Sequence, residues 1–210
     1  MKITPFLFPN YGYLETKLPS EALEFLKEAI KNKQEKINST LAGNIGSSHT
    51  ILDKDDWFFN HVLQTCISHY THHFGKDCIQ TSLTRDCRYA LKSMWVNCQK
   101  KHQFNPLHNH SGFFSFVVWY KIPFSGESEK NLPFSKHSNI PSASCFEFAY
   151  NDVLGRIRNK IFSLSPKDEG TMLFFPATLM HQVYPFYTSD NNRISISGNI
   201  SLDPEQMLNA

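Results

Sequence analysis

Two histidines, His108 and His110, flank a single asparagine in the stretch that begins at Phe104. Side chains two positions apart in a strand point to the same face, so this pair presents two imidazoles to one ligand. Pro106 before the pair and Gly112 after it predict that the pair lies where a strand ends in a turn. Since imidazole nitrogens are common ligands of transition metals, the pair predicts a metal site that needs further ligands from elsewhere in the chain.

His181 is the candidate for the third ligand. It follows the run Phe174-Phe175-Pro176 and precedes Val183, so it enters a predicted strand from a turn. An isolated histidine of this kind is usually only hydrogen-bonded at a surface. The order of the motifs around His181, described below, is what favours a ligand.

A second group of histidines lies on a predicted helix and comprises His61, His69, His72 and His73. His69 and His73 are four residues apart, which would place them on one helix face. The carboxylate that an H-E-x-x-H metal motif requires is missing, however. We therefore interpret this group as a polar helix face.

The chain divides into a helical part followed by a strand-rich part. Leu23, Leu26 and Ile30 recur at helical spacing, and a second helix is predicted from Asp53 to about Phe74. From Ile79 onward, short β-branched and aromatic runs alternate with turn residues. The predicted strands are Leu91–Gln99, Phe113–Ile122, Ser144–Tyr150, Ile161–Leu164, Thr171–Phe175, Met180–Phe186 and Arg193–Leu202.

This order of elements predicts a β-sandwich or jelly roll with helices buttressing one sheet. At 210 residues, the chain has the length of one domain (1–210), with 1–78 as helical support and 79–202 as the β core. We expect residues 1–17 to supply an edge strand. The polar stretch Pro123–Ser142 is predicted to be a mobile loop at the mouth of the barrel.

Composition excludes several classes of protein. The net charge is only +2 and the basic residues are scattered, so no electrostatic footprint for nucleic acid is present. No apolar run is long enough for a membrane span, and the N-terminus does not read as a signal peptide. Five cysteines without a C-x-x-C pair argue against a disulfide framework and favour the cytoplasm.

The strings Gly170-Thr171-Met172-Leu173-Phe174-Phe175-Pro176, His181 and Arg193-Ile194-Ser195 occur in the order G-x-x-x-x-F-P, H, R-x-S. Together with the H-x-H block and Trp95-Val96-Asn97, this order resembles the 2-oxoglutarate/Fe(II)-dependent oxygenases. It is most similar to the prolyl-4-hydroxylase-like branch found in marine bacteria and phages. The resemblance extends over about Lys92–Ser201 and matches poorly over Phe124–Asn159.

The resemblance implies a mainly β protein with N-terminal helices, whose core is a double-stranded β-helix (jelly-roll) barrel with Fe(II) at one open end. It implies a dioxygenase that uses 2-oxoglutarate and O2 to hydroxylate a second substrate. His108, His110 and His181 would hold the iron. Arg193 would bind the distal carboxylate of 2-oxoglutarate through its planar fork, with help from Ser195, Tyr120 and Asn97.

His110 departs from the family pattern, in which a carboxylate stands at this position. Three neutral imidazoles give the iron centre one negative charge fewer than the usual set of two histidines and one carboxylate. Three explanations are open at this point. His110 can be a true third ligand, which we favour; it can point away and leave a position for water or an anion; or an acid such as Glu147 or Asp152 can complete the set.

Other classes of protein share parts of this pattern. A cupin also uses H-x-H, but its next glutamate and its P-x-G-x-x-H motif are missing. A non-catalytic jelly-roll module would bind a ligand without turnover, and a zinc hydrolase lacks a candidate general base. The expected substrate is a small molecule or a peptide, with Trp95, Trp119, Phe114 and the Pro123–Ser142 loop as its walls, and a homodimer stays open.

Overall fold

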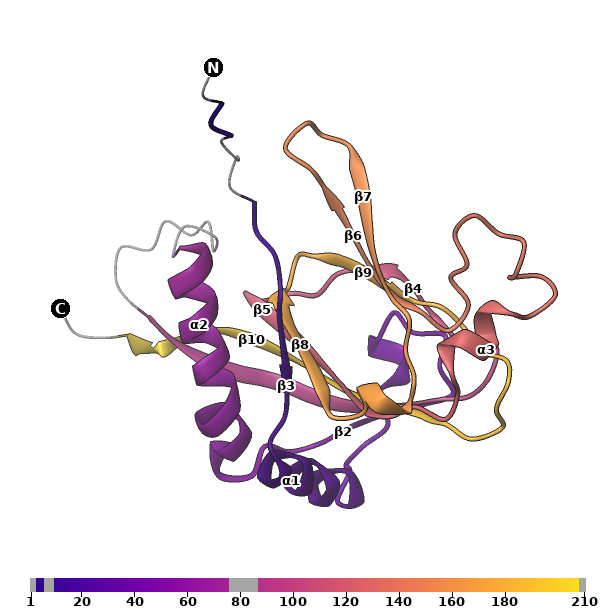
Figure 1. The fold of residues 1–210 in the computed structure, drawn as a ribbon. Helices are drawn as coiled ribbons and strands as arrows, with labels where there is room; N and C mark the ends of the chain where they lie inside the picture. The colour runs from indigo at the N-terminus through magenta and orange to yellow at the C-terminus, as the bar shows by residue number, and fades with distance from the viewer. Residues whose placement is uncertain (1–2, 6–9, 76–86, 208–210) are drawn as a thin grey trace.

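The computed structural model describes residues 3–5, 10–75 and 87–207. Two antiparallel sheets face one another across the middle of the molecule (Figure 1). The larger sheet has six strands in the order β1-β8-β5-β10-β3-β2, and the smaller has four in the order β4-β9-β6-β7. The expected jelly-roll architecture, mainly β with N-terminal helices, is confirmed.

The strand bounds follow the predicted turns closely in the second half of the chain. The strands of the larger sheet are β1 (Leu14–Lys17), β2 (Ser47–Thr50), β3 (Cys87–Gln99), β5 (Phe114–Lys121), β8 (Thr171–Pro176) and β10 (Arg193–Met207). Those of the smaller sheet are β4 (Asn105–His108), β6 (Phe146–Asn151), β7 (Ile157–Phe162) and β9 (Met180–Val183). The β6–β7 hairpin projects away from the rest of the smaller sheet (Figure 1).

Strand β10 lies at the centre of the larger sheet, antiparallel to both β3 and β5. Successive side chains of a strand point to opposite faces. Ile194, Ile196 and Ile200 therefore pack toward the helices, where the last two are fully buried. The residues between them, including Ser195, face the space between the two sheets.

The helices cover the outer face of the larger sheet (Figure 1). They are α1 (Ser20–Lys31), a π-helical turn (Phe59–Leu63) and α2 (Gln64–Phe74). Asp53 begins this second helical segment by accepting hydrogen bonds from the backbone N–H groups of Phe58 and Phe59, and Gly75 ends it with a φ of 82°. Both ends were predicted, but the π-helical turn was not.

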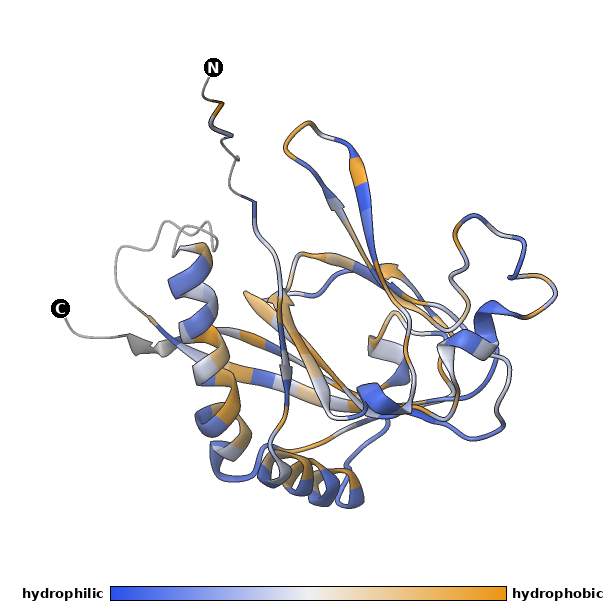
Figure 2. Ribbon diagram, viewed as in Figure 1, coloured by the Kyte–Doolittle hydropathy of each residue, from blue (hydrophilic) through white to orange (hydrophobic). Residues whose placement is uncertain are grey.

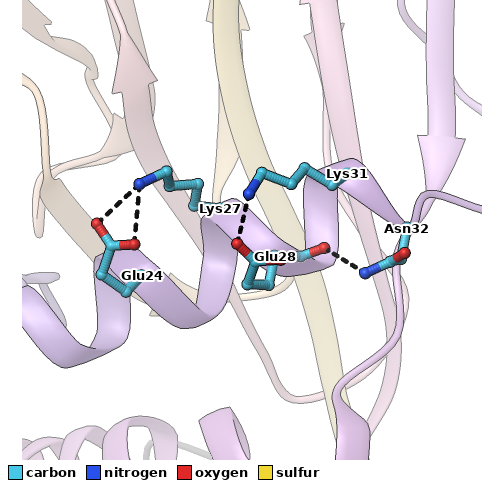
Figure 3. A network of polar contacts seen from close by, with 5 residues as sticks. All are labelled: Glu24, Lys27, Glu28, Lys31 and Asn32. Atoms are coloured by element: carbon cyan, nitrogen blue, oxygen red, sulfur yellow. Dashed lines mark hydrogen bonds and ion pairs between the residues drawn. The ribbon is translucent and has the colours of Figure 1, made fainter.

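Each helix presents an apolar face to the sheet and a polar face to solvent (Figure 2). On α1, Ala22 and Leu26 are fully buried against the sheet. On its exposed face, Lys27 pairs with Glu24 and Lys31 with Glu28 (Figure 3). Such exposed pairs contribute little to stability, so burial of the apolar face holds this helix in place.

A second apolar cluster lies between the two sheets. It is formed mainly by aromatic side chains, among them Trp119, Phe146, Phe148, Phe175 and Phe186. Trp119 packs against Phe146 with their ring centroids 6.0 Å apart. This cluster fills part of the space between the sheets and leaves the remainder for the site described below.

The N-terminal part contributes more than helical support. Strand β1 pairs with β8 and strand β2 pairs with β3, so residues before position 79 form both edges of the larger sheet. The edge strand expected within residues 1–17 is thus present as β1.

The stretch Pro123–Ser142 is tied down rather than loose. It holds a short helix, α3 (Gly126–Lys130), and the Glu129 side chain is fully buried. The Glu129 carboxylate accepts hydrogen bonds from the backbone N–H groups of Tyr187 and Thr188 and from the Thr188 hydroxyl. The expectation of a mobile loop did not anticipate this anchor, which only the folded chain brings together.

Replacing Glu129 by alanine should loosen this stretch. It would leave two backbone N–H groups of Tyr187 and Thr188 without their acceptor, which costs about 1–3 kcal/mol when such groups are buried. We expect a lower free energy of unfolding in urea and faster proteolytic cleavage within 123–142. Glu127→Ala, on the same helix but not buried, is the matched control; equal effects of both variants would contradict the anchoring role.

Candidate active site

The three predicted metal ligands come together at one point. The ligand nitrogens of His108, His110 and His181 all lie within 4.8 Å of one another. The Nε2 atoms of His110 and His181 are 3.1 Å apart. Two cis ligands on an octahedral metal with bonds of roughly 2.1 Å stand about 3 Å apart, so the spacing fits a shared metal ion.

The strands explain how these imidazoles meet. His108 on β4 is the direct cross-strand partner of His181 on β9, so both side chains stand on one face of the smaller sheet. His110 lies just beyond β4, and its backbone N–H donates to Ala177 O. Gly112 then turns the chain with a φ of 103°, where an added Cβ would lie 2.7 Å from Ile200 O.

Backbone carbonyls orient two of the three rings. The Nδ1 atom of His108 lies 2.7 Å from Pro106 O, and that of His181 lies 2.9 Å from Leu179 O. A carbonyl can only accept, so each Nδ1 carries the proton and each Nε2 keeps its lone pair for a ligand. Metal-binding histidines are commonly fixed by such a hydrogen bond at the second nitrogen.

Burial keeps these rings neutral. Burial, assisted by repulsion from the positive charge of a protonated His108, lowers the pKa of His110 to about 4 and that of His181 to about 3. Phe146 and Phe175 pack against His181, with ring centroids 5.8 Å and 5.1 Å away. The group is therefore unprotonated, as ligands must be, at neutral pH.

A cavity of about 440 Å³ opens beside the three histidines. One wall comes from the larger sheet and carries Trp95 and Asn97 of β3 and Ser195 of β10. Asn97 and Ser195 are cross-strand partners, and the Asn97 side chain accepts a hydrogen bond from the Ser48 hydroxyl at 2.7 Å. Two of the four predicted co-substrate contacts, Asn97 and Ser195, thus lie in the same cavity as the histidines.

Sequence reasoning missed further polar residues of this wall, two of which lie on β10. Ser197 and Asn199 also line the cavity, and Asn199 accepts a hydrogen bond from Ser115. Their signal was available, because they continue the alternation of Ser195 along β10. Within the described residues, no aspartate, glutamate, lysine or arginine side chain lines this cavity.

Arg193 lies on the same face of β10 as Ser195, but it is not among the residues that line the cavity. It is buried, and it donates to Gln99 Oε1, Ser144 O and Tyr184 O at 2.6–3.2 Å. Burial lowers its pKa to about 9, an effect that nearby Cys145 and Glu129 oppose. The structure therefore brings Arg193 near the site without placing it against the cavity.

Tyr120 does not reach the site, contrary to the prediction. It packs with the helix-side core, and α1 is near enough for Lys27 and Glu24 to influence its pKa. On β5 the neighbouring position, Trp119, faces the smaller sheet instead. The predicted contact of Tyr120 with the co-substrate is therefore not supported, because Tyr120 stands on the helix-side face of β5.

Of the aromatic residues predicted to line the substrate site, only Trp95 lines the cavity. Trp95 lines the cavity, with its ring 5.5 Å from that of His110. Phe114 instead packs against Tyr70 on the helix side, and Trp119 lies in the cluster between the sheets. Of the two aromatic walls predicted on β5, neither lines the cavity.

The two acids considered as a third ligand lie elsewhere. Glu147 accepts hydrogen bonds from Gln182 and Tyr184, on the face of the smaller sheet opposite Phe146 and Phe148. Asp152 binds backbone N–H groups of its own hairpin and pairs with Arg158. In the described chain the group around His181 contains histidines alone, and the histidines of α2 are exposed on the far side of the larger sheet.

A comparison with family models matches residues 93–199, more than half of the chain, to a family described as "Putative 2OG-Fe(II) oxygenase". The chain belongs to this family of 2-oxoglutarate- and Fe(II)-dependent oxygenases. It is an enzyme whose cofactor is Fe(II) and whose co-substrates are 2-oxoglutarate and O2. The cupin alternative is thereby set aside. No curated protein matches the chain in sequence.

Solved structures share the fold at low identity. The viral collagen prolyl hydroxylase of Paramecium bursaria Chlorella virus-1, in complex with 2-oxoglutarate, has a TM-score of 0.50 at 17% identity and covers 90% of this chain and 94% of its own. A Pseudomonas putida prolyl-4-hydroxylase has a TM-score of 0.50 at 12% identity and covers 90% of this chain and 91% of its own. HygX of Streptomyces hygroscopicus, with nickel and 2-oxoglutarate bound, has a TM-score of 0.51 at 10% identity and covers 91% of this chain and 83% of its own.

None of the helices in the described residues is long and apolar enough to cross a membrane.

The lowered pKa values of His110 and His181 predict acid sensitivity of the metal-free protein. Unfolding restores the ordinary histidine pKa of about 6.5, so the unfolded chain binds more protons below that pH. The free energy of unfolding, measured with a chelator present, should therefore fall as pH drops from about 6.5 toward 4. His110→Asn should flatten this slope, whereas His69→Asn, on the exposed face of α2, should not; equal slopes in all three proteins would contradict the assignment.

Proposed function

We propose that this chain is a hydroxylase in which His108, His110 and His181 hold Fe(II) and Arg193, Ser195 and Asn97 bind 2-oxoglutarate. The observation that carries the proposal is the convergence of three neutral imidazoles on one point. When bound, Fe(II), O2 and 2-oxoglutarate supply the chemistry of the family, in which 2-oxoglutarate becomes succinate and carbon dioxide while a C–H bond is hydroxylated.

The residues of the chain would position the reactants and exclude water. The apolar rings of Phe146 and Phe175 shield one side of the histidine group. Ser195 and Asn97 offer a hydroxyl and an amide from the opposite wall. Enzymes of this kind depend on the protein for binding and orientation, since the metal and its co-substrates carry the bond-breaking chemistry.

The prime substrate would be a small molecule or a peptide segment with an uncharged reacting part. The described cavity lining carries hydroxyl, amide and aromatic groups but no charged side chain, so a charged group placed there would lose its hydration without a partner. A peptidyl proline, as the two prolyl hydroxylases of similar fold suggest by their names, meets this condition. A small uncharged metabolite meets it equally.

Release of succinate from 2-oxoglutarate with Fe(II), in the absence of a prime substrate, tests the proposal. His181→Ala should lower Fe(II) affinity by roughly tenfold or more, since even groups that only orient a ligand change affinity by 10–100-fold. Arg193→Ala should raise the 2-oxoglutarate KM by about tenfold or more, because charge-assisted hydrogen bonds are lost. If both variants turn over 2-oxoglutarate as the wild type does, the proposed site is wrong.

The role of His110 can be tested by metal titration. Trp95 lies beside His110 and should report metal binding through its fluorescence. His110→Ala should weaken Fe(II) binding under anaerobic conditions by roughly tenfold or more, whereas His110→Asp, which supplies the carboxylate common in the family, should bind Fe(II) at least as well as the wild type. Wild-type affinity in His110→Ala would exclude His110 as a ligand.

A further inference from the structure

Gln99 occupies the edge of Arg193 that a carboxylate would use. Its side-chain oxygen accepts hydrogen bonds from Arg193 Nε at 3.2 Å and from Nη2 at 2.6 Å. These two nitrogens form one side of the guanidinium fork, the geometry in which arginine binds a carboxylate with two parallel hydrogen bonds. Both side chains are buried, with 4% of Gln99 and 3% of Arg193 exposed.

The positive charge of Arg193 has no ion-pair partner in the described chain. The remaining donors go to backbone carbonyls of Ser144 and Tyr184, and the rings of Phe124 and Phe186 lie 5.6 Å and 5.8 Å from the guanidinium carbon. The nearby buried acid, Glu129, uses its carboxylate on Tyr187 and Thr188. A buried charge surrounded only by neutral acceptors is costly to maintain, which favours a role in binding an anion.

Ser144 adds a second polar group without a partner. Its hydroxyl is buried and makes no hydrogen bond within the described residues, although the carbonyl of the same residue contacts Arg193. The backbone of Ser144 has a φ of 64°, a conformation that non-glycine residues rarely adopt. Buried hydroxyls almost always have partners, so this hydroxyl, on the residue whose carbonyl contacts Arg193, favours a polar ligand in this region.

We propose that Gln99 is a positioning residue that sets the affinity for 2-oxoglutarate, because its side-chain oxygen holds the Nε and Nη2 edge of Arg193 and the distal carboxylate must replace it there. This inference rests on the proposed function. Gln99 lies at the end of β3, directly across the strand pair from Arg193, and two residues from Asn97, which lines the cavity. A neutral amide is a weaker partner for a guanidinium than a carboxylate, so the exchange is favourable.

Gln99→Glu is the decisive variant, since it replaces the neutral acceptor with a permanent charged one of nearly equal size. Calorimetric titration of the Ni(II)-loaded protein would compare 2-oxoglutarate with 2-oxobutyrate, which lacks the distal carboxylate. We expect the wild type to prefer 2-oxoglutarate and Gln99→Glu to lose about tenfold or more of its 2-oxoglutarate affinity. The affinity for 2-oxobutyrate and for Ni(II) should stay the same. Gln64→Glu, an equal change at an exposed position of α2, is the matched control.

Gln99→Leu tests the inference from the opposite side and serves if Gln99→Glu fails to fold. It removes the competing acceptor without adding charge, so 2-oxoglutarate should bind more tightly than to the wild type. Unchanged 2-oxoglutarate preference in Gln99→Glu, or unchanged or weaker 2-oxoglutarate binding in Gln99→Leu, would overturn the role of Gln99 and leave the proposed function intact. A wild-type protein that binds neither 2-oxo acid would instead overturn the proposed function.

Discussion

The two faces of strand β10 lie in different environments: one packs in the apolar core under the helices, and the other lines the cavity of the candidate site. Ile194, Ile196 and Ile200 pack under the helices, whereas the alternate residues Ser195, Ser197 and Asn199 line the cavity. A slip of one residue would exchange the two sets and bury hydroxyls in an apolar core. Packing of α1 and α2 on the outer face therefore fixes the register of the polar groups inside. The helical support and the site are linked through the alternation of this one strand.

Removal from water has opposite consequences for the two kinds of basic group in the site. For His110 and His181 it favours the neutral ring, and the neutral ring is the form that binds a metal. For Arg193 it opposes the charged form, but the charge persists because the guanidinium pKa, about 9, stays above neutrality. The same burial thus yields three uncharged imidazoles, which can bind a metal, and one charged guanidinium. A metal ion and a carboxylate are the ligands that such a pair of environments can accept.

The sequence predicted what local chemistry and periodicity determine. The H-x-H pair rests on turn residues and on alternation, whereas His181 and Ser195 were selected by the order of motifs that resembles the oxygenase family. The structure brings the three histidines together and places Ser195 in the same cavity. Tyr120 was misplaced because β5 is apolar on both faces, so its pattern does not reveal which residues face inward. Glu129 and Gln99 could not be found at all. Each acts on a segment far away in sequence, and nothing in its own neighbourhood marks it.

The charge of the site follows from the histidine at position 110. Under the proposed assignment, three neutral imidazoles leave the full charge of Fe(II) uncompensated, and the described cavity lining supplies no carboxylate. Arg193 adds a second positive charge nearby. 2-Oxoglutarate carries two carboxylates, one for each of these cations, so its binding would neutralise both ends of the site. In a buried cavity such electrostatic attraction is strong. Retention of the co-substrate would then depend on charge more heavily here than in relatives whose iron already carries a protein carboxylate.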